Sequence, residues 1–93
     1  MIELPSHIKI GAYVQVAEWV GLVEDIAVGE THVLVLVSSP KQIYRHAPPE
    51  WLEFHADNPD MIRPAIPQRY WDECRRYSER LKEDIRKVAK HLP

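Results

Sequence analysis

The residues of this chain that could carry out acid–base, nucleophilic or metal chemistry are five histidines, one cysteine and three pairs of adjacent carboxylates. His7 and His91 lie near the two ends of the sequence, whereas His32, His46 and His55 fall on three different predicted strands and could converge. A zinc site needs three or four ligands at suitable spacing, but the sequence has no HExxH pattern and no cysteine pair. We therefore expect structural or solvent-exposed histidines and no metal.

The remaining candidates for catalysis are equally weak. Cys74 falls within a predicted apolar helix stripe, where packing as a small hydrophobic residue is a stronger interpretation than a role as nucleophile. Adjacent carboxylates, as in Glu24–Asp25, point to opposite faces of a strand, and the pairs Asp72–Glu73 and Glu83–Asp84 fall on a solvated helix face. With only three glycines and no phosphate-binding loop, we expect no cofactor and no free-standing enzyme.

Alternating apolar and polar residues predict a mainly β domain over residues 1–55. The expected strands are 8–16, 20–26, 31–37, 42–46 and 52–55, with a 3₁₀ turn at 47–51. Gly21 is expected to mark a bend or bulge where a side chain would obstruct a close approach, and Gly29 to be a left-handed turn residue. Five short strands at this spacing predict a small five-stranded barrel.

Two further segments follow the predicted barrel. Residues 56–67 contain three prolines, which predict an extended, Pro-rich linker. Residues 68–93 predict one long amphipathic helix, whose apolar residues recur at steps of four, three, four, four, three and four. The residues of this helix stripe are Tyr70, Cys74, Tyr77, Leu81, Ile85, Val88 and Leu92.

The strand THVLVLV, residues 31–37, is apolar on both faces. If its valines face the core, Leu34 and Leu36 lie on the outside, together with Leu22 of the preceding strand. We expect the helix stripe to dock on this outer face, either within one chain or from a neighbouring chain. The near-heptad spacing also permits pairing of helices between chains, and a homo-oligomer is expected.

Charge is divided between the two parts of the chain. Residues 1–67 carry four Lys/Arg against nine Asp/Glu, giving −5, and residues 68–93 carry eight against five, giving +3. The basic helix could bind nucleic acid, but acidic residues interrupt it, and the acidic body argues against phosphate contacts. A solvated helix face, or contact with an acidic body, is the stronger interpretation.

Aromatic residues in the predicted loops and fourth strand supply the best candidate binding site. Flat rings give a large contact area at low entropic cost. The residues of this predicted groove are Trp19, Tyr44, Arg45, His46 and Trp51. It could accept an extended or proline-rich peptide. In the alternative interpretation the same rings pack on the linker or helix of their own chain.

The glycine, valine and acidic residues of the predicted barrel resemble a known pattern. The matching residues are Gly11, Gly21, Val23, Glu24, Asp25, Ile26, Thr31 and Pro48. Over residues 8–54 they are similar to the small SH3-like/Sm-like β-barrel of small-conductance mechanosensitive channels, and secondly to a KOW-type barrel. Ala12 and Pro49 depart from the channel pattern. The first resemblance implies a ring-forming or partner-binding barrel; the second implies RNA or ribosome-associated partners.

Together these patterns predict a non-enzymatic scaffold or adaptor that binds another protein and self-associates through barrel and helix. Two alternatives remain open: a nucleic-acid-binding barrel, and an accessory or regulatory subunit of a larger enzyme or complex. No apolar run approaches the roughly 20 residues of a membrane helix, and the first residues lack a signal-peptide pattern. With a single cysteine, a cytoplasmic protein without a membrane partner is expected.

Overall fold

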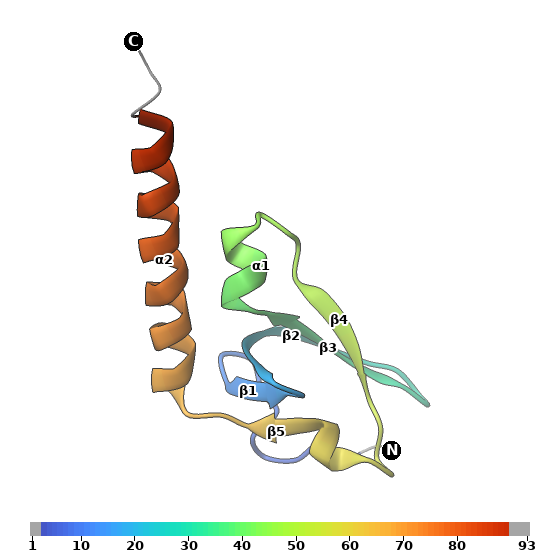
Figure 1. The fold of residues 1–93 in the computed structure, drawn as a ribbon. Coiled ribbons are helices and arrows are strands. Elements are labelled where there is room, and N and C mark those ends of the chain that lie inside the picture. Colours follow the sequence, from blue (N-terminus) through green and yellow to red (C-terminus); the bar gives the residue numbers. More distant parts are fainter. Residues whose placement is uncertain (1–2, 90–93) are drawn as a thin grey trace.

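A computed structural model describes residues 3–89 as one antiparallel sheet and one long helix (Figure 1). The five strands pair in the order β4-β3-β2-β1-β5. Their bounds are β1 Tyr13–Val16, β2 Trp19–Val28, β3 Val33–Ser38, β4 Glu50–Phe54 and β5 Ile62–Pro64. The helices are α1 Pro40–Tyr44, the 3₁₀ turn η1 Pro59–Met61, and α2 Pro67–Ala89.

The core lies on the inner face of this sheet. Val33, Val35 and Val37 of β3 are buried there, as their alternation predicts. Phe54 of β4 and Ile62 of β5 belong to the same cluster, although these strands form opposite edges of the sheet. The sheet therefore curls around its own core. No ladder joins β4 to β5 within residues 3–89, so the sheet is open and not closed into a barrel.

The prediction of a fourth strand at residues 42–46 is wrong, because most of this segment belongs to α1. Ser39 caps the helix: its hydroxyl accepts a hydrogen bond from the Gln42 amide, and the Gln42 side chain accepts one from the Ser39 amide. This capping box, with Pro40 at the first helical position, outweighs the alternation of the segment. The predicted 3₁₀ turn at 47–51 is also wrong, since Glu50 and Trp51 already belong to β4.

α1 ends in a Schellman motif. His46 adopts a left-handed conformation with φ of 56°, while its amide donates to the carbonyl of Ile43. The amide of Ala47 donates to the carbonyl of Gln42 at 2.8 Å. These two bonds satisfy carbonyl groups at the end of the helix that would otherwise lack partners.

The predicted linker, residues 56–67, contains the fifth strand of the sheet. β5 pairs antiparallel with β1, joining Ile62 to Val16 and Pro64 to Val14. Pro64 is tolerated because β5 is an edge strand. Ile62 is buried and Met61 half-buried, whereas Ile66 is exposed. The segment therefore lies against the sheet through part of its apolar residues only.

Gly21 permits close packing between strands, but it does not form the bulge. A Cβ atom at Gly21 would overlap Val37 Cγ1 and lie 3.0 Å from the Ser38 carbonyl oxygen. Gly21 pairs regularly with Val14, and the irregular register falls between Val23 and Asp25. The prediction for Gly29 is wrong too, because Gly11 is the glycine with positive φ among the described residues.

α2 begins one residue before its predicted start, and Leu92 lies outside the described residues. Its first turns pack on the outer face of the sheet. Tyr70 is 3% exposed, and its ring lies 5.2 Å from the ring of Tyr13 in β1. Arg69 donates from Nη1 to Oε1 of Gln15 at 2.5 Å. Further along, α2 runs beside α1 and then continues past it (Figure 1).

Candidate interaction surfaces

An apolar cleft lies between α1 and α2. Its volume is about 290 Å³. The lining residues are Pro40, Ile43, Tyr44, His46, Cys74, Tyr77, Ser78 and Leu81, and we call this site the α1–α2 cleft. The capping of α1 by Ser39 and its Schellman end place Ile43 and Tyr44 opposite the helix stripe. The cleft can therefore accept an apolar side chain or a short apolar segment.

Two aromatic rings and one carboxylate fix the two helices to each other at this cleft. The ring of Tyr44 stacks on that of Tyr77, with centroids 5.2 Å apart and planes at 29°. The Tyr44 hydroxyl donates to Oδ2 of Asp84 at 2.8 Å. This hydrogen bond raises the pKa of Tyr44, because it would be lost if the phenol ionised beside the carboxylate. Tyr44 is therefore a neutral donor that holds α2 at Asp84.

Cys74 lines the cleft as a half-buried thiol. Desolvation by burial raises its pKa above the usual 9.0 and outweighs the lowering effect of a hydrogen bond with Tyr70, while the nearby Glu73 carboxylate also raises it. A nucleophilic cysteine needs the opposite shift, because the thiolate is the reactive form. The environment of Cys74 thus favours a protonated thiol that packs against its neighbours.

The helix stripe is covered in its first turns and exposed in its last. Tyr70 is buried and Cys74 and Tyr77 are half-buried. Leu81, Ile85 and Val88 are 49%, 59% and 62% exposed, and we call these three residues the tip stripe. The step from Tyr70 to Leu81 is eleven residues, about three whole turns, so the stripe stays on one face of a straight helix.

A second apolar surface remains open on the outer face of the sheet. In the ladder, Leu34 lies between Ala27 and Glu53, and Leu36 lies between Asp25 and Trp51. Leu34 and Trp51 are 37% and 46% exposed, and Leu36 is half-buried. We call Ala27, Leu34, Leu36 and Trp51 the sheet patch. Leu22 pairs with Tyr13, on which Tyr70 of α2 packs, and is half-buried.

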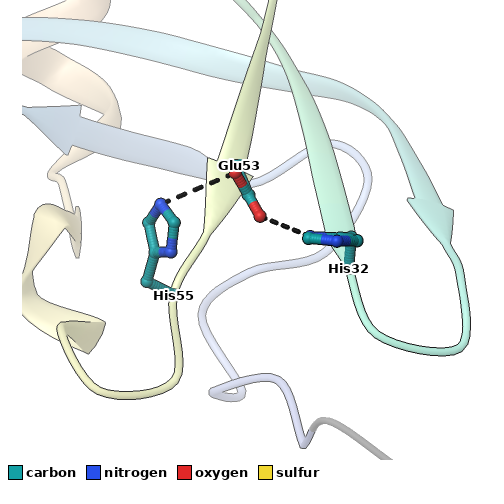
Figure 2. A network of polar contacts seen from close by, with 3 residues as sticks. All are labelled: His32, Glu53 and His55. Atoms are coloured by element: carbon teal, nitrogen blue, oxygen red, sulfur yellow. Dashed lines mark hydrogen bonds and ion pairs between the residues drawn. The ribbon is translucent and has the colours of Figure 1, made fainter.

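The predicted convergence of histidines occurs for two of the three and includes a carboxylate that we did not single out. Glu53 lies between His32 and His55 (Figure 2). Nδ1 of His32 bonds to Oε1 of Glu53 at 2.5 Å, and Nε2 of His55 lies 3.8 Å from Oε2. The alternation of β4 could have identified Glu53, since residues 53 and 55 lie on one face. His46 lies elsewhere, at the end of α1.

The five residues of the predicted groove lie in three places. Tyr44 and His46 line the α1–α2 cleft, while Arg45 is the exposed C-cap of α1. Trp19, half-buried against the core, lines a separate polar hollow, and Trp51 lies on the sheet patch. The stacking of Tyr44 on α2 matches the alternative in which the rings pack within their own chain.

Residues 3–89 contain neither a metal site nor a membrane-spanning helix. No three histidine, cysteine or acidic side chains there are arranged to hold a metal ion. No helix in that range is both long and apolar enough to span a bilayer.

Comparisons with protein-family models, curated proteins and solved structures found no match. The surfaces of the molecule itself are therefore the observations that bear on its function.

Proposed function

We propose that this protein is a non-enzymatic scaffold or adaptor that binds a partner protein in the α1–α2 cleft and self-associates. The observation that carries the proposal is the continuity of one apolar surface. It runs from the cleft, through Leu81, onto the exposed Ile85 and Val88. Contiguous apolar surface beside a pocket is typical of protein-binding sites.

The surroundings of this surface indicate what the partner looks like. Arg80, Asp84 and Lys87 flank the stripe on one side, where Asp84 is held by Tyr44, and Lys82 and Arg86 follow its residues on the other. A groove with cationic rims fits an amphipathic partner segment that has large apolar anchors and acidic flanks. Ile43, 55% exposed on α1, would contact such an anchor from the opposite wall.

The fold supports, but does not require, the small-barrel class. The open sheet curls so far that its two edge strands share one core. We propose that this open sheet is a variant of the SH3-like/Sm-like small barrel, which its resemblance to the channel barrel implies, and the shared core of the two edge strands supports this proposal. An accessory or regulatory subunit of a larger complex would use the same α1–α2 cleft and the same self-association. It would differ from an adaptor only in the partner that it binds. A nucleic-acid-binding barrel is less well supported, since residues 1–67 carry a net charge of −5.

The proposal is tested by capture from a lysate of the natural host with the protein as bait. Ile43→Glu and Leu81→Glu place a carboxylate on each wall of the cleft, whereas Arg76→Gln changes a charge outside the cleft and serves as the control. We expect the wild type and Arg76→Gln to retain the same partner and both cleft variants to lose it. Retention by both cleft variants contradicts the proposal.

The single cysteine supplies a second measurement. Cys74 lies in the cleft, so a bound partner should slow its alkylation by iodoacetamide. The purified partner should reduce the alkylation rate of the wild type and leave that of Ile43→Glu unchanged. A partner that binds without protecting Cys74 uses another surface. Binding of RNA or DNA that weakens steeply with added salt would instead favour the nucleic-acid alternative.

A further inference from the structure

The start of α2 and the outer face of the sheet already form an interface within one chain. Tyr70 of the helix stripe packs on Tyr13, which lies beside Leu22 in the ladder. The tip stripe continues the covered part of α2, and the sheet patch lies on the same outer face. The two uncovered surfaces are therefore extensions of two surfaces that pack together in this fold.

One chain cannot bring these extensions together. α2 continues past α1, while the hairpin that joins β2 to β3, near Leu34, lies on the opposite side of the molecule (Figure 1). The molecule is elongated, with extents of 62 × 23 × 19 Å. The hydrogen bond from Tyr44 to Asp84 holds the helix in this direction. The tip stripe can therefore cover a sheet patch only in another chain.

The charges around the two surfaces are complementary. Exposed Asp25 lies beside Leu36, and Glu53 lies beside Leu34. Basic residues outnumber acidic ones beside the tip stripe: Lys82 and Arg86 follow its residues on one side, and Arg80, Asp84 and Lys87 precede them on the other. On the same part of the helix, Asp84 accepts the hydrogen bond from Tyr44. Glu79 and Glu83, by helical spacing, lie on the face opposite the stripe.

We propose that two copies of this chain form a symmetric dimer in which the tip stripe of each docks on the sheet patch of the other. This inference rests on the proposed self-association and names its mode. Each copy contributes both surfaces, so a two-fold axis makes the contact twice and doubles the buried area. The cationic flanks of the tip stripe then lie next to Asp25 and Glu53 of the second copy. The part of the α1–α2 cleft that is lined by Ile43, Tyr44, Cys74 and Tyr77 lies outside this contact, so a partner competes with the second copy only at the tip stripe.

Sedimentation velocity at about 100 μM protein and low salt tests the mode, because a micromolar dimer is then largely assembled. Leu34→Asp and Ile85→Asp each place a carboxylate in one of the two surfaces. We expect each to raise the dissociation constant at least about tenfold. Leu34→Ile and Arg76→Gln are matched controls that should sediment as the wild type does. Circular dichroism checks that both aspartate variants keep the fold.

Mixing the two aspartate variants separates this mode from pairing of like surfaces. Leu34→Asp retains a normal tip stripe, and Ile85→Asp retains a normal sheet patch. A mixed dimer therefore keeps one of the two contacts, and the mixture should associate more strongly than either variant alone. If two helices paired with each other, Leu34→Asp alone would dimerise as the wild type does, and if two sheet patches paired, Ile85→Asp alone would do so. In neither case would the mixture associate more strongly than both variants alone. A mixture that stays as monomeric as its components overturns the proposal.

Further measurements distinguish failure of this mode from failure of the proposed function. Raising salt from about 0.1 to about 0.5 M should weaken the dimer, because screening reduces the contacts of Asp25 and Glu53 with the basic flanks. Ile43→Glu should leave the dimer intact, and dimerisation should not slow alkylation of Cys74. A dimer that protects Cys74 overturns the mode while leaving self-association in place. A strictly monomeric wild type overturns the mode and leaves partner binding in the cleft to its own test.

Discussion

Replacement of Tyr70 by alanine should remove a large part of the stability of the protein. Tyr70 is the one residue of the described part of α2 that is fully buried, at 3% exposed, and its ring packs on Tyr13. Truncation of a buried aromatic residue to alanine costs about 3–5 kcal/mol. A domain of this size has a free energy of unfolding of roughly 5–14 kcal/mol. Tyr70→Ala should therefore remove about a fifth of it or more, because α2 loses its anchor on the sheet.

Urea denaturation measures this loss. Far-ultraviolet circular dichroism follows α2, and tryptophan fluorescence follows the sheet through Trp19 and Trp51, as well as Trp71 on the helix. Work at about 1 μM keeps association from adding to the apparent stability. Tyr70→Phe keeps the ring and should change the free energy of unfolding by less than about 1 kcal/mol. Ile85→Ala, on the exposed part of α2, should change it by less than about 0.5 kcal/mol.

A loss below about 1 kcal/mol for Tyr70→Ala would refute this reasoning, since truncations in a packed interface cost more. Separate transitions for the two signals in the wild type would refute it as well, because they would mean that helix and sheet unfold independently. A double-mutant cycle with Tyr13→Ala should recover about 0.5–1.5 kcal/mol of coupling for the two rings.

Three other perturbations have definite expected outcomes. Gly21→Ala should destabilise the sheet by about 1–3 kcal/mol in urea denaturation, because the added methyl group overlaps Val37; an unchanged midpoint would contradict the close approach of β2 and β3. His46→Gly should raise stability by up to about 1 kcal/mol, because glycine adopts the left-handed φ of 56° without strain, and a lower melting temperature would count against it. The raised pKa values of Tyr70 and Cys74 mean that the folded state keeps protons that the unfolded chain releases. Their contribution to stability is thus complete below the ordinary pKa of each group, 9.0 for Cys74 and 10.0 for Tyr70, and is lost as pH rises through the folded values. Chemical denaturation between pH 8 and pH 11, about one unit on either side of these values, should show that fall, and a flat profile would exclude it.

Much of the sheet follows from local patterns, and the exception at residues 42–46 has a local cause. The buried valines of β3 recur at every second residue, and the helix stripe recurs at every third or fourth residue over several turns. Each period is long enough to predict a strand or a helix from the pattern of apolar residues. The segment QIYRH also alternates, but a five-residue alternation is a weak signal. The capping box of Ser39 and Gln42, with Pro40 between them, is the stronger local signal and predicts the helix.

β5 could not be predicted from its own residues. It is three residues long and contains Pro64, so no local pattern distinguishes it from the rest of the proline-rich segment. Its pairing with β1 depends on the return of the chain to the free edge of the sheet. The His7 ring, which hydrogen-bonds to the carbonyl of Ile62 at 2.8 Å, is part of the same long-range arrangement.

The sequence predicts which residues belong to the helix stripe and to the outer face of the sheet, but it does not predict where the aromatic residues lie relative to one another. The spacing of the helix stripe and the outward position of Leu34 followed from periodicity. The separation of Trp19, Tyr44 and Trp51 did not, because it depends on α1, which brings Tyr44 to α2 and away from the other two rings. Whether Leu34 and its neighbours bind a helix stays a prediction.

The exposed end of α2 has a consequence for local unfolding. In the described residues after Asp84, up to Ala89, no side-chain hydrogen bond or ion pair ties the helix to the rest of the molecule. Short isolated helical segments are marginal in water because nucleation is costly. Amide hydrogens should therefore exchange in a gradient, slowest near Tyr70 and fastest near Val88. Any molecule that covers the tip stripe shifts this helix–coil equilibrium toward helix. Part of its intrinsic affinity is then spent on ordering the last turns, and slower exchange at Ile85 and Val88 would report occupancy directly.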